Sequence, residues 1–196
     1  MTGTRERILA ATNESFRRRG FHATSLKHIT AAAGVPTGSV YHFFPAGKDE
    51  LAREVVVTSG EAYRQLFELI ADEAGDVSSA VVAFFESAAA VLEETDYLDP
   101  CPIGTVAREV ASTNDVLRAA TEQVFASWVA TLDARLRAAG VPAGEARPLA
   151  TTIVAALEGG FVLARVRRDA MPLRAVGDSM RELVDGARTR GALLRK

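Results

Sequence analysis

The sequence predicts an all-α protein of about nine helices. Apolar residues recur at helical spacings of three and four along almost all of the 196 residues, and no sustained period-two alternation is present. The chain also lacks a two-residue hairpin turn between apolar runs. Glycine and proline mark the breaks between helical segments, as at Gly20, Gly34 and Gly140-Val141-Pro142. Strands are therefore not expected.

The composition is that of an ordinary soluble globular protein, with 48% hydrophobic and 24% charged residues. There is no run of eighteen or more apolar residues, so no membrane span or membrane partner is expected. The amino terminus is polar and charged, unlike a secretory signal. The single Cys101 cannot form an intrachain disulfide, which fits a reducing compartment. We therefore expect a cytoplasmic location.

Charge is distributed unevenly along the chain. Residues 1–48 contain seven Lys and Arg and only two acidic residues, whereas the whole chain has a net charge of -2. This positive excess is typical of a segment that meets a polyanion. The run Arg17-Arg18-Arg19 has two interpretations: it neutralises the carboxyl end of a helix dipole, or it lies near a nucleic-acid backbone.

Three short helices are expected in the basic segment. The first spans about residues 4–19 and ends at Gly20. The second is capped by Thr24 or Ser25 and ends at Gly34. Pro36 suits the first position of the third, and residues 45–47 end it. Two helices joined by a glycine turn predict a helix-turn-helix, the second helix of which enters a DNA groove.

The rest of the chain predicts a larger helical domain. We expect residues 1–47 to form the helix-turn-helix DNA-binding domain and residues 48–196 a helical ligand-binding and dimerisation domain. Ser112, with Asp115 three residues later, resembles a capping box that opens one of its helices. Its last two long helices are expected at about residues 145–167 and 172–189.

The third helix exposes hydroxyl and aromatic groups where a buried helix would be apolar. Val40, with Phe43 or Phe44, is expected to hold it from behind. Hydroxyls, amides at helix starts and cations commonly contact phosphates. The expected DNA-binding residues are Thr24, Ser25, Pro36, Thr37, Gly38, Ser39, Tyr41, His42 and Lys48. The alternative is an ordinary helical hairpin with an exposed polar face.

These residues carry a resemblance to a known family. The motifs are Arg7-Ile8-Leu9-Ala10-Ala11, Phe16, Gly20-Phe21, Thr24-Ser25, Ile29, Ala32-Ala33-Gly34-Val35, Gly38-Ser39-Val40-Tyr41-His42-Phe43-Phe44 and Lys48-Asp49-Glu50-Leu51. They resemble the TetR family of bacterial transcriptional regulators. Pro36-Thr37 stands where that family often has Ser-Lys, which removes one expected DNA contact. Phe44-Pro45-Ala46-Gly47-Lys48 and Cys101-Pro102 are similar to the LmrA-like branch.

The resemblance implies a homodimer that binds an operator through its amino-terminal helices and a small inducer through its larger domain. Dimerisation through the last two long helices is expected, helped by the small residues Ala156, Gly159 and Gly160. The apolar faces of these two helices have an alternative interpretation, as part of the core of a single chain.

Aromatic residues gather in the larger domain, as in a typical small-molecule cavity. The expected ligand-binding residues, some aromatic and some thiol or charged, are Tyr63, Phe67, Phe84, Phe85, Cys101, Arg108, Phe125, Trp128, Glu158 and Phe161. The inducer is expected to be lipophilic or aromatic. For each aromatic residue the alternative is a plain core position, and Cys101 is interpreted as a structural or pocket-wall thiol rather than a redox sensor.

The expected function is that of a ligand-responsive transcriptional repressor. It binds a palindromic double-stranded DNA operator as a homodimer and is released by the inducer. The alternative is a ligand-independent DNA-binding regulator or an activator. No catalytic residue, metal site or cofactor is expected, because the chain has neither a nucleophile–base pair nor ligand spacing among its His, Cys and acidic residues. An enzyme is therefore not expected.

Overall fold

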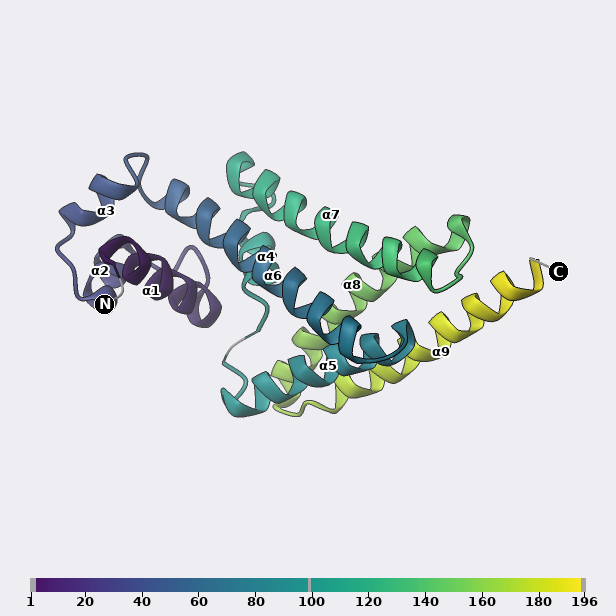
Figure 1. The fold of residues 1–196 in the computed structure, drawn as a ribbon. Helices are drawn as coiled ribbons and strands as arrows, with labels where there is room; N and C mark the ends of the chain where they lie inside the picture. The colour runs from purple at the N-terminus through teal and green to yellow at the C-terminus, as the bar shows by residue number, and fades with distance from the viewer. Residues whose placement is uncertain (1–2, 99, 195–196) are drawn as a thin grey trace. The chain divides into compact units, whose positions relative to one another are not determined.

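The computed structural model describes residues 3–98 and 100–194, and within them it contains nine α-helices and no strand (Figure 1). The all-helical prediction is confirmed. In chain order the helices are α1 (Thr4–Arg19), α2 (Leu26–Ala33), α3 (Gly38–Phe43), α4 (Lys48–Glu73), α5 (Val77–Glu94), α6 (Pro102–Val110), α7 (Asp115–Ala138), α8 (Ala143–Arg167) and α9 (Met171–Leu194).

Packing divides the described chain into two compact units that differ from the expected linear domains. We call residues 3–61 and 100–124 the head unit, and residues 62–98 and 125–194 the pocket unit. The head unit thus adds α6, the first half of α4 and the start of α7 to the three amino-terminal helices. The functional boundary at residues 47 and 48 stays a prediction.

The head unit is built around a few fully buried apolar side chains. Ile8 and Phe16 of α1, Ile29 of α2, Val40 of α3 and Leu51 of α4 are all fully buried. Gly34 ends α2 in the left-handed conformation, with φ of 63° and ψ of 41°, which glycine adopts without steric cost. The glycine turn and the buried face together hold α2 and α3 as a helix-turn-helix.

Two helix starts differ from the sequence predictions. The regular helix α3 begins at Gly38 rather than at Pro36. The backbone N–H groups of Ser39 and Val40 donate to the carbonyl oxygens of Pro36 and Thr37, three residues earlier, so this segment forms a turn before the α-helix. The capping box predicted at Ser112 is wrong. The side-chain oxygen of Asn114 accepts the N–H of Leu117 at 3.0 Å, so Asn114 caps α7.

In the pocket unit, α9 packs along α5 and α8. Arg174 on α9 donates to Glu86 and Glu93 on α5, and these hydrogen bonds raise the pKa of the Arg174 guanidinium further above its ordinary value. Glycine permits close approach: a Cβ at Gly177 would lie 2.9 Å from Cβ of Phe85, and one at Gly160 would lie 2.8 Å from a Leu173 methyl.

The outer faces of α8 and α9 expose apolar side chains. Val162, Leu163 and Val166 on α8 and Leu183 on α9 are 42%, 50%, 80% and 48% exposed. Gly160, which was expected to favour contact between subunits, is instead buried within the chain against Leu173. Among the described helices α8 alone is long and apolar enough to cross a membrane by length and composition, criteria that a core helix also meets.

Candidate DNA interface and ligand pocket

The helix α3 presents its polar face to solvent. Tyr41 is 54% exposed, and Thr37, Gly38 and His42 are also exposed. Val40 and, just after the helix, Phe44 are fully buried and hold it from behind. The side chains expected to face DNA are therefore accessible on a helix that two buried anchors fix in place.

The two residues expected to contact DNA at the start of α2 differ from each other. Ser25 is exposed, and its hydroxyl oxygen accepts the N–H of His28 at 3.1 Å as the N-cap. Thr24 is fully buried, and its hydroxyl donates to the carbonyl oxygen of Gly20 at 2.7 Å. In this structure the Thr24 side chain therefore supports the loop before α2 and presents no hydroxyl to a DNA surface.

Lys48 has partners within the protein. Its Nζ donates to the carbonyl oxygen of Phe21 at 2.6 Å and lies 4.0 Å from the centroid of the Phe21 ring. Burial lowers the pKa of the Lys48 ammonium, an effect that the carboxylates of Asp49 and Glu109 oppose. Lys48 thus braces the loop between α1 and α2, and contact with DNA stays a prediction.

Glu109, at the end of α6, holds the same loop, a role that the sequence did not indicate. Its Oε2 accepts the backbone N–H of His22 at 2.7 Å, and its carbonyl oxygen lies 3.3 Å from Nε2 of His22. A Cβ at Gly20 would lie 1.7 Å from Oε1 of Glu109, so glycine leaves the space that this carboxylate fills. No local pattern links residues so far apart in the chain.

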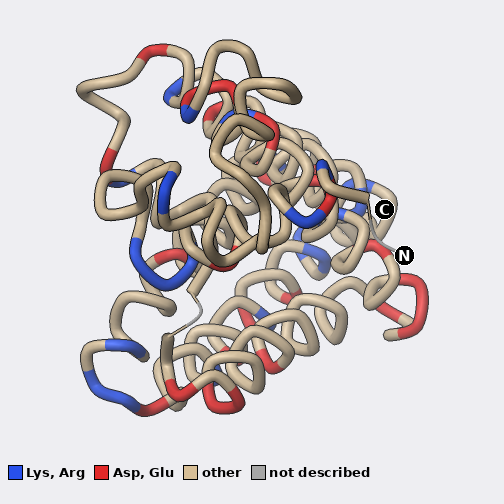
Figure 2. The backbone as a smooth tube through the Cα atoms, turned by 90° about the vertical axis from the view of Figure 1, so that its left-hand side faces the viewer, with Lys and Arg blue, Asp and Glu red and all other residues tan. Residues whose placement is uncertain are grey.

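Charge along the backbone is spread in short segments of either sign (Figure 2). The positive excess of residues 1–48 is therefore a difference in number and does not form one continuous basic run. Several of these cations are already engaged: Arg5 pairs with Glu54 at 2.5 Å, and Arg18 with Glu14 at 3.3 Å.

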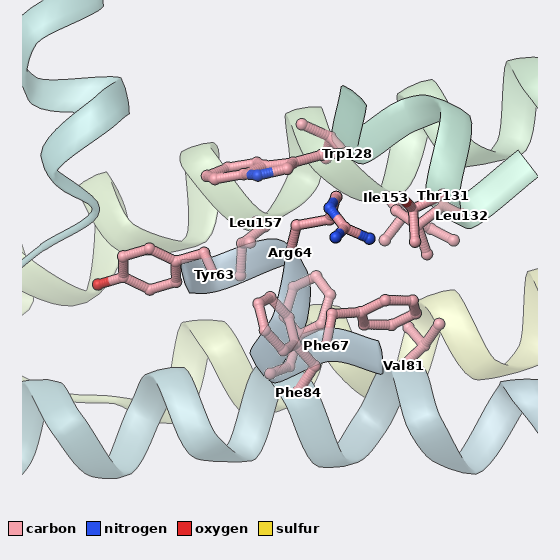
Figure 3. Close-up of a pocket in the computed structure, with 12 residues that line it drawn as sticks. Tyr63, Arg64, Phe67, Val81, Phe84, Trp128, Thr131, Leu132, Ile153 and Leu157 are labelled. Carbon is pink, nitrogen blue, oxygen red and sulfur yellow. The ribbon is translucent and has the colours of Figure 1, made fainter. Parts of the chain in front are cut away.

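The pocket unit contains an apolar cavity of about 40 Å³ that is partly open to solvent. Four helices line it, and Figure 3 shows their side chains converging on one space. The rings of Phe67 and Phe84 meet edge to face with centroids 5.5 Å apart, and those of Tyr63 and Trp128 lie 6.1 Å apart. The lining residues are Tyr63, Arg64, Phe67, Val81, Phe84, Phe85, Trp128, Thr131, Leu132, Ile153, Val154 and Leu157.

Comparison with known proteins identifies two matched segments. Residues 8–55 match the family described as bacterial regulatory proteins, tetR family. Residues 78–179, more than half of the chain, match the C-terminal domain described as transcriptional regulator LmrA/YxaF-like.

The chain belongs to the TetR family of transcriptional regulators. The uncharacterized HTH-type transcriptional regulator YxaF of Bacillus subtilis (strain 168) is 35% identical over 181 residues, which cover 92% of this chain and 95% of YxaF. The HTH-type transcriptional regulator LmrA of the same strain is 28% identical, over 92% of this chain and 96% of LmrA. A TetR transcriptional regulator from Legionella pneumophila shares the fold with a TM-score of 0.80 at 24% identity, over 95% of this chain and 97% of that one.

These findings confirm the predicted family and its LmrA-like branch. The chain is therefore a DNA-binding transcriptional regulator and not an enzyme. Within residues 3–98 and 100–194, no group of three or more His, Cys, Asp or Glu side chains is placed to hold a metal ion.

Half of the residues expected to bind ligand line the cavity of this TetR-family chain: Tyr63, Phe67, Phe84, Phe85 and Trp128. The other half do not. Cys101 and Arg108 lie on or beside α6 in the head unit, where Cys101 is buried as the N-cap of that helix. Phe125 packs edge to face on Trp128, with ring centroids 5.5 Å apart, and is not among the lining residues.

Glu158 and Phe161 follow the lining residue Leu157 on α8 and are outside the lining. The sequence analysis missed the aliphatic part of the wall, Thr131 and the single charged lining residue, Arg64. Aliphatic residues at helical spacing mark only a buried face, so nothing in the sequence separated these positions from ordinary core.

Proposed function

We propose that this TetR-family regulator is a repressor that binds a palindromic operator as a homodimer and leaves it when a lipophilic or aromatic molecule occupies the pocket. One observation carries the proposal. The helix α4 begins in the head unit and also contributes Tyr63, Arg64 and Phe67 to the wall of an apolar cavity. A single helix therefore links the unit that contains the helix-turn-helix to the wall of the candidate ligand pocket. A cytoplasmic location follows in this proposal from the need to reach chromosomal DNA.

The DNA contacts are assigned to the exposed side of the helix-turn-helix. Thr37 and Ser39, at the start of α3, are proposed to contact base edges, since the first residues of a recognition helix usually do so. Ser25, Tyr41 and His42 are proposed to contact phosphates, with Pro36 and Gly38 allowing close approach. Lys48 remains a candidate phosphate contact in addition to its brace on Phe21. Buried Thr24 is left out of this set.

Two copies of the chain are needed because operator half-sites lie about 34–36 Å apart, one helical turn of DNA. The exposed apolar residues of α8 and α9, namely Val162, Leu163, Val166, Met171 and Leu183, support an interface there. Large exposed apolar patches commonly mark a contact with another chain, and these side chains are the candidates for such a patch.

Ligand release follows from the size of the cavity. A cavity of roughly 150 Å³ is known to bind benzene, whereas this pocket measures about 40 Å³. An aromatic ligand therefore has to displace lining side chains, three of which belong to α4. If the displaced arrangement separates the two α3 helices unfavourably, the ligand shifts the population away from the DNA-binding state.

The test begins with selection of the operator from genomic DNA, followed by fluorescence anisotropy of the labelled site. We expect two chains per site and release by aromatic compounds. Val154→Phe, which fills the cavity, should bind the operator normally and resist release. Ala130→Phe adds the same ring to an exposed position of α7 and should behave as the parent protein. Release that is identical in both variants would contradict the pocket assignment.

A second function has one observation in its favour. The small volume of the cavity also fits a ligand-independent regulator, the pocket unit of which serves only to join subunits. Such a protein would keep its operator in the presence of every aromatic compound that is tried. Transcription from an operator-bearing promoter distinguishes repression from activation, because a repressor lowers the transcript level and an activator raises it.

A further inference from the structure

Thr30 is a buried polar residue at the point where α2 meets the start of α3. Its exposed fraction is 3%. Its Oγ1 lies 3.2 Å from the carbonyl oxygen of Lys27, one turn earlier on α2, and 3.5 Å from Oγ1 of Thr37, the residue just before α3. A pair of hydroxyls therefore connects the two helices of the helix-turn-helix, and one of the two belongs to a candidate DNA contact.

The direction of these two hydrogen bonds follows from the groups that form them. A carbonyl oxygen can only accept a hydrogen bond, whereas a hydroxyl donates one proton and can also accept. Both bonds can form together only if the Thr30 hydroxyl donates to Lys27 and the Thr37 hydroxyl donates to Thr30. Every other arrangement of the two protons makes one bond fewer at a buried side chain, where a lost bond is not replaced by water.

This assignment fixes what Thr37 presents to its surroundings. The residue is exposed, and its hydroxyl makes no cap bond at the start of α3. A threonine hydroxyl that is free to rotate can donate to one base edge and accept from another, so it reads no particular base. Because the one proton of the Thr37 hydroxyl is directed at Thr30, its oxygen offers only lone pairs to a molecule outside.

The four bases differ at the edge that such an acceptor would meet. In the major groove adenine and cytosine present an exocyclic amino group, whereas guanine and thymine present a carbonyl oxygen. We propose that Thr30 determines specificity by fixing the polarity of the Thr37 hydroxyl, so that Thr37 selects a base with an exocyclic amino group. The inference rests on the proposed base contact of Thr37, and it adds the chemical class of base that this residue reads.

The first experiment locates the contact and measures its preference. The selected operator is varied one base pair at a time, and the Kd of each site is measured for the parent protein and for Thr37→Val. The contacted position is the one at which Thr37→Val loses discrimination. There the parent should prefer adenine or cytosine over guanine or thymine by about twofold to tenfold, the effect of one neutral hydrogen bond.

A modified base then tests the amino group directly. Purine in place of adenine, or 2-pyrimidinone in place of cytosine, removes the exocyclic amino group at that position. The affinity of the parent protein should fall by about the same twofold to tenfold. The affinity of Thr37→Val should not change, because this variant has no hydroxyl to accept the bond.

Substitutions at Thr30 test whether it sets this preference. Thr30→Val and the smaller Thr30→Ala both free the proton of Thr37, so the preference for amino bases should fall below about twofold. Thr30→Ser keeps a hydroxyl and should keep the preference. Thr12→Val is the matched control, since it removes another buried hydroxyl of the head unit, one that donates to the carbonyl oxygen of Ile8 at 2.7 Å. It should leave the base preference unchanged.

The outcomes separate this inference from the proposed function. A purely structural role of Thr30 would lower the affinity for all four bases alike and leave their order unchanged, which overturns the inference. Guanine or thymine preferred at the contacted position, or a base preference in Thr37→Val equal to that of the parent, also overturns it, and both leave an operator-binding repressor. If the parent protein binds no sequence more tightly than unrelated DNA, both proposals fail.

Discussion

The candidate DNA contacts and the candidate ligand pocket differ in how far apart their residues lie in the chain. The candidate DNA contacts fall between Ser25 and Lys48, and six of them lie between positions 36 and 42. The pocket lining runs from Tyr63 to Leu157 and comes from four helices. One surface depends on the conformation of a short exposed helix, and the other on the packing of a whole unit. Substitutions should therefore affect DNA binding in the first case and stability in the second.

Glycines show a related difference between local and long-range roles, and both kinds occur in each unit. In the head unit Gly20, Gly34 and Gly47 have positive φ and end or join helices. In the pocket unit Gly160, Gly177 and Gly191 lie inside helices, where a Cβ would meet another helix or turn. A turn glycine can be identified from its local sequence, but a packing glycine can be identified only from its neighbour in space.

The largest expected effect comes from the exposed apolar face of α8. Val166→Asp should prevent dimerisation. Operator binding should then weaken by about 10²- to 10⁴-fold, because the helix-turn-helix of a second subunit is no longer linked to the first when it binds. Sedimentation and fluorescence anisotropy measure the two effects. Val116→Asp makes the same change at a 53% exposed valine of α7 in the head unit, and should leave the protein dimeric. A dimeric Val166→Asp with full affinity would move the interface elsewhere.

The next effect concerns stability alone. Replacing glycine by alanine within a helix normally stabilises by up to about 1 kcal/mol. At Gly191, however, a Cβ would lie 2.1 Å from the carbonyl oxygen of Gly140, a backbone atom that has little freedom to move. Gly191→Ala should therefore destabilise by about 1–3 kcal/mol, the usual range for overpacking. Urea unfolding at fixed protein concentration measures the change.

Gly144→Ala is the matched control, since a Cβ there has no neighbour within 4 Å. It should leave stability unchanged or raise it slightly. If both variants were stabilised, the close approach of α9 to the turn at Gly140 would not hold in solution.

Most of the fold, and the exposure of much of the candidate DNA-binding surface, could be predicted because their signals are local. Gly20 and Gly34 end helices, Ser25 caps one, and the run from Gly38 to Phe44 carries both exposed and buried positions. The exceptions arise where a polar or charged side chain has a partner within the protein that the sequence pattern does not indicate. Thr24 has a polar side chain, but Gly20 accepts its hydroxyl bond, and Lys48 has Phe21 as its partner.

The pocket could be predicted only for its aromatic residues. Tyr63, Phe67, Phe84, Phe85 and Trp128 stand out in a sequence with 7% aromatic residues. The direction in which each helix turns its faces depends on the other helices, so Phe125 could not be distinguished from Trp128 in advance. In the sequence, Arg64 and Glu68 have the spacing of an ordinary ion pair on the surface of one helix. Only the packing of the helices places Arg64 beside an apolar cavity.

A smaller effect tests whether α3 acts only through its surface. Tyr41→Phe should weaken binding about tenfold at operator and non-operator DNA alike, if a hydrogen bond to a phosphate is lost. The salt dependence should not change, because the hydroxyl carries no charge. Unfolding should also be unaffected, since Tyr41 is 54% exposed. Lys48→Met, which removes the brace on Phe21, should by contrast lower stability.

Tyr97→Phe is the control for this substitution. It removes the same hydroxyl in the pocket unit and keeps the ring that lies 5.9 Å from the Arg168 guanidinium. Equal losses of DNA affinity in the two tyrosine variants would argue that Tyr41 has no direct contact with DNA.

The smallest effect is confined to the pocket unit and depends on pH. Asp76 caps α5, accepting the N–H groups of Ser78 and Ser79 at 2.9 and 3.0 Å. The backbone hydrogen bond from Ser79 is the main reason that the pKa of the Asp76 carboxyl lies below its ordinary value of 3.8. A lowered carboxyl pKa means that the ionised form stabilises the fold above pH 3.8, and that this contribution is lost as the pH falls through the folded-state pKa.

Asp76→Ala should therefore lower the free energy of unfolding by about 1 kcal/mol near neutral pH, the typical value for a lost helix cap. The difference from the parent protein should shrink on acidification below pH 3.8. Asp76→Asn keeps the acceptor oxygen without a titrating group, so the difference between Asp76→Asn and Asp76→Ala should not vary with pH. Operator affinity should be the same in all three proteins, because Asp76 lies in the pocket unit and outside the helix-turn-helix. The difference in unfolding free energy between the parent protein and Asp76→Ala could instead stay constant down to the lowest accessible pH. That result would mean that the carboxylate charge contributes nothing at this helix end.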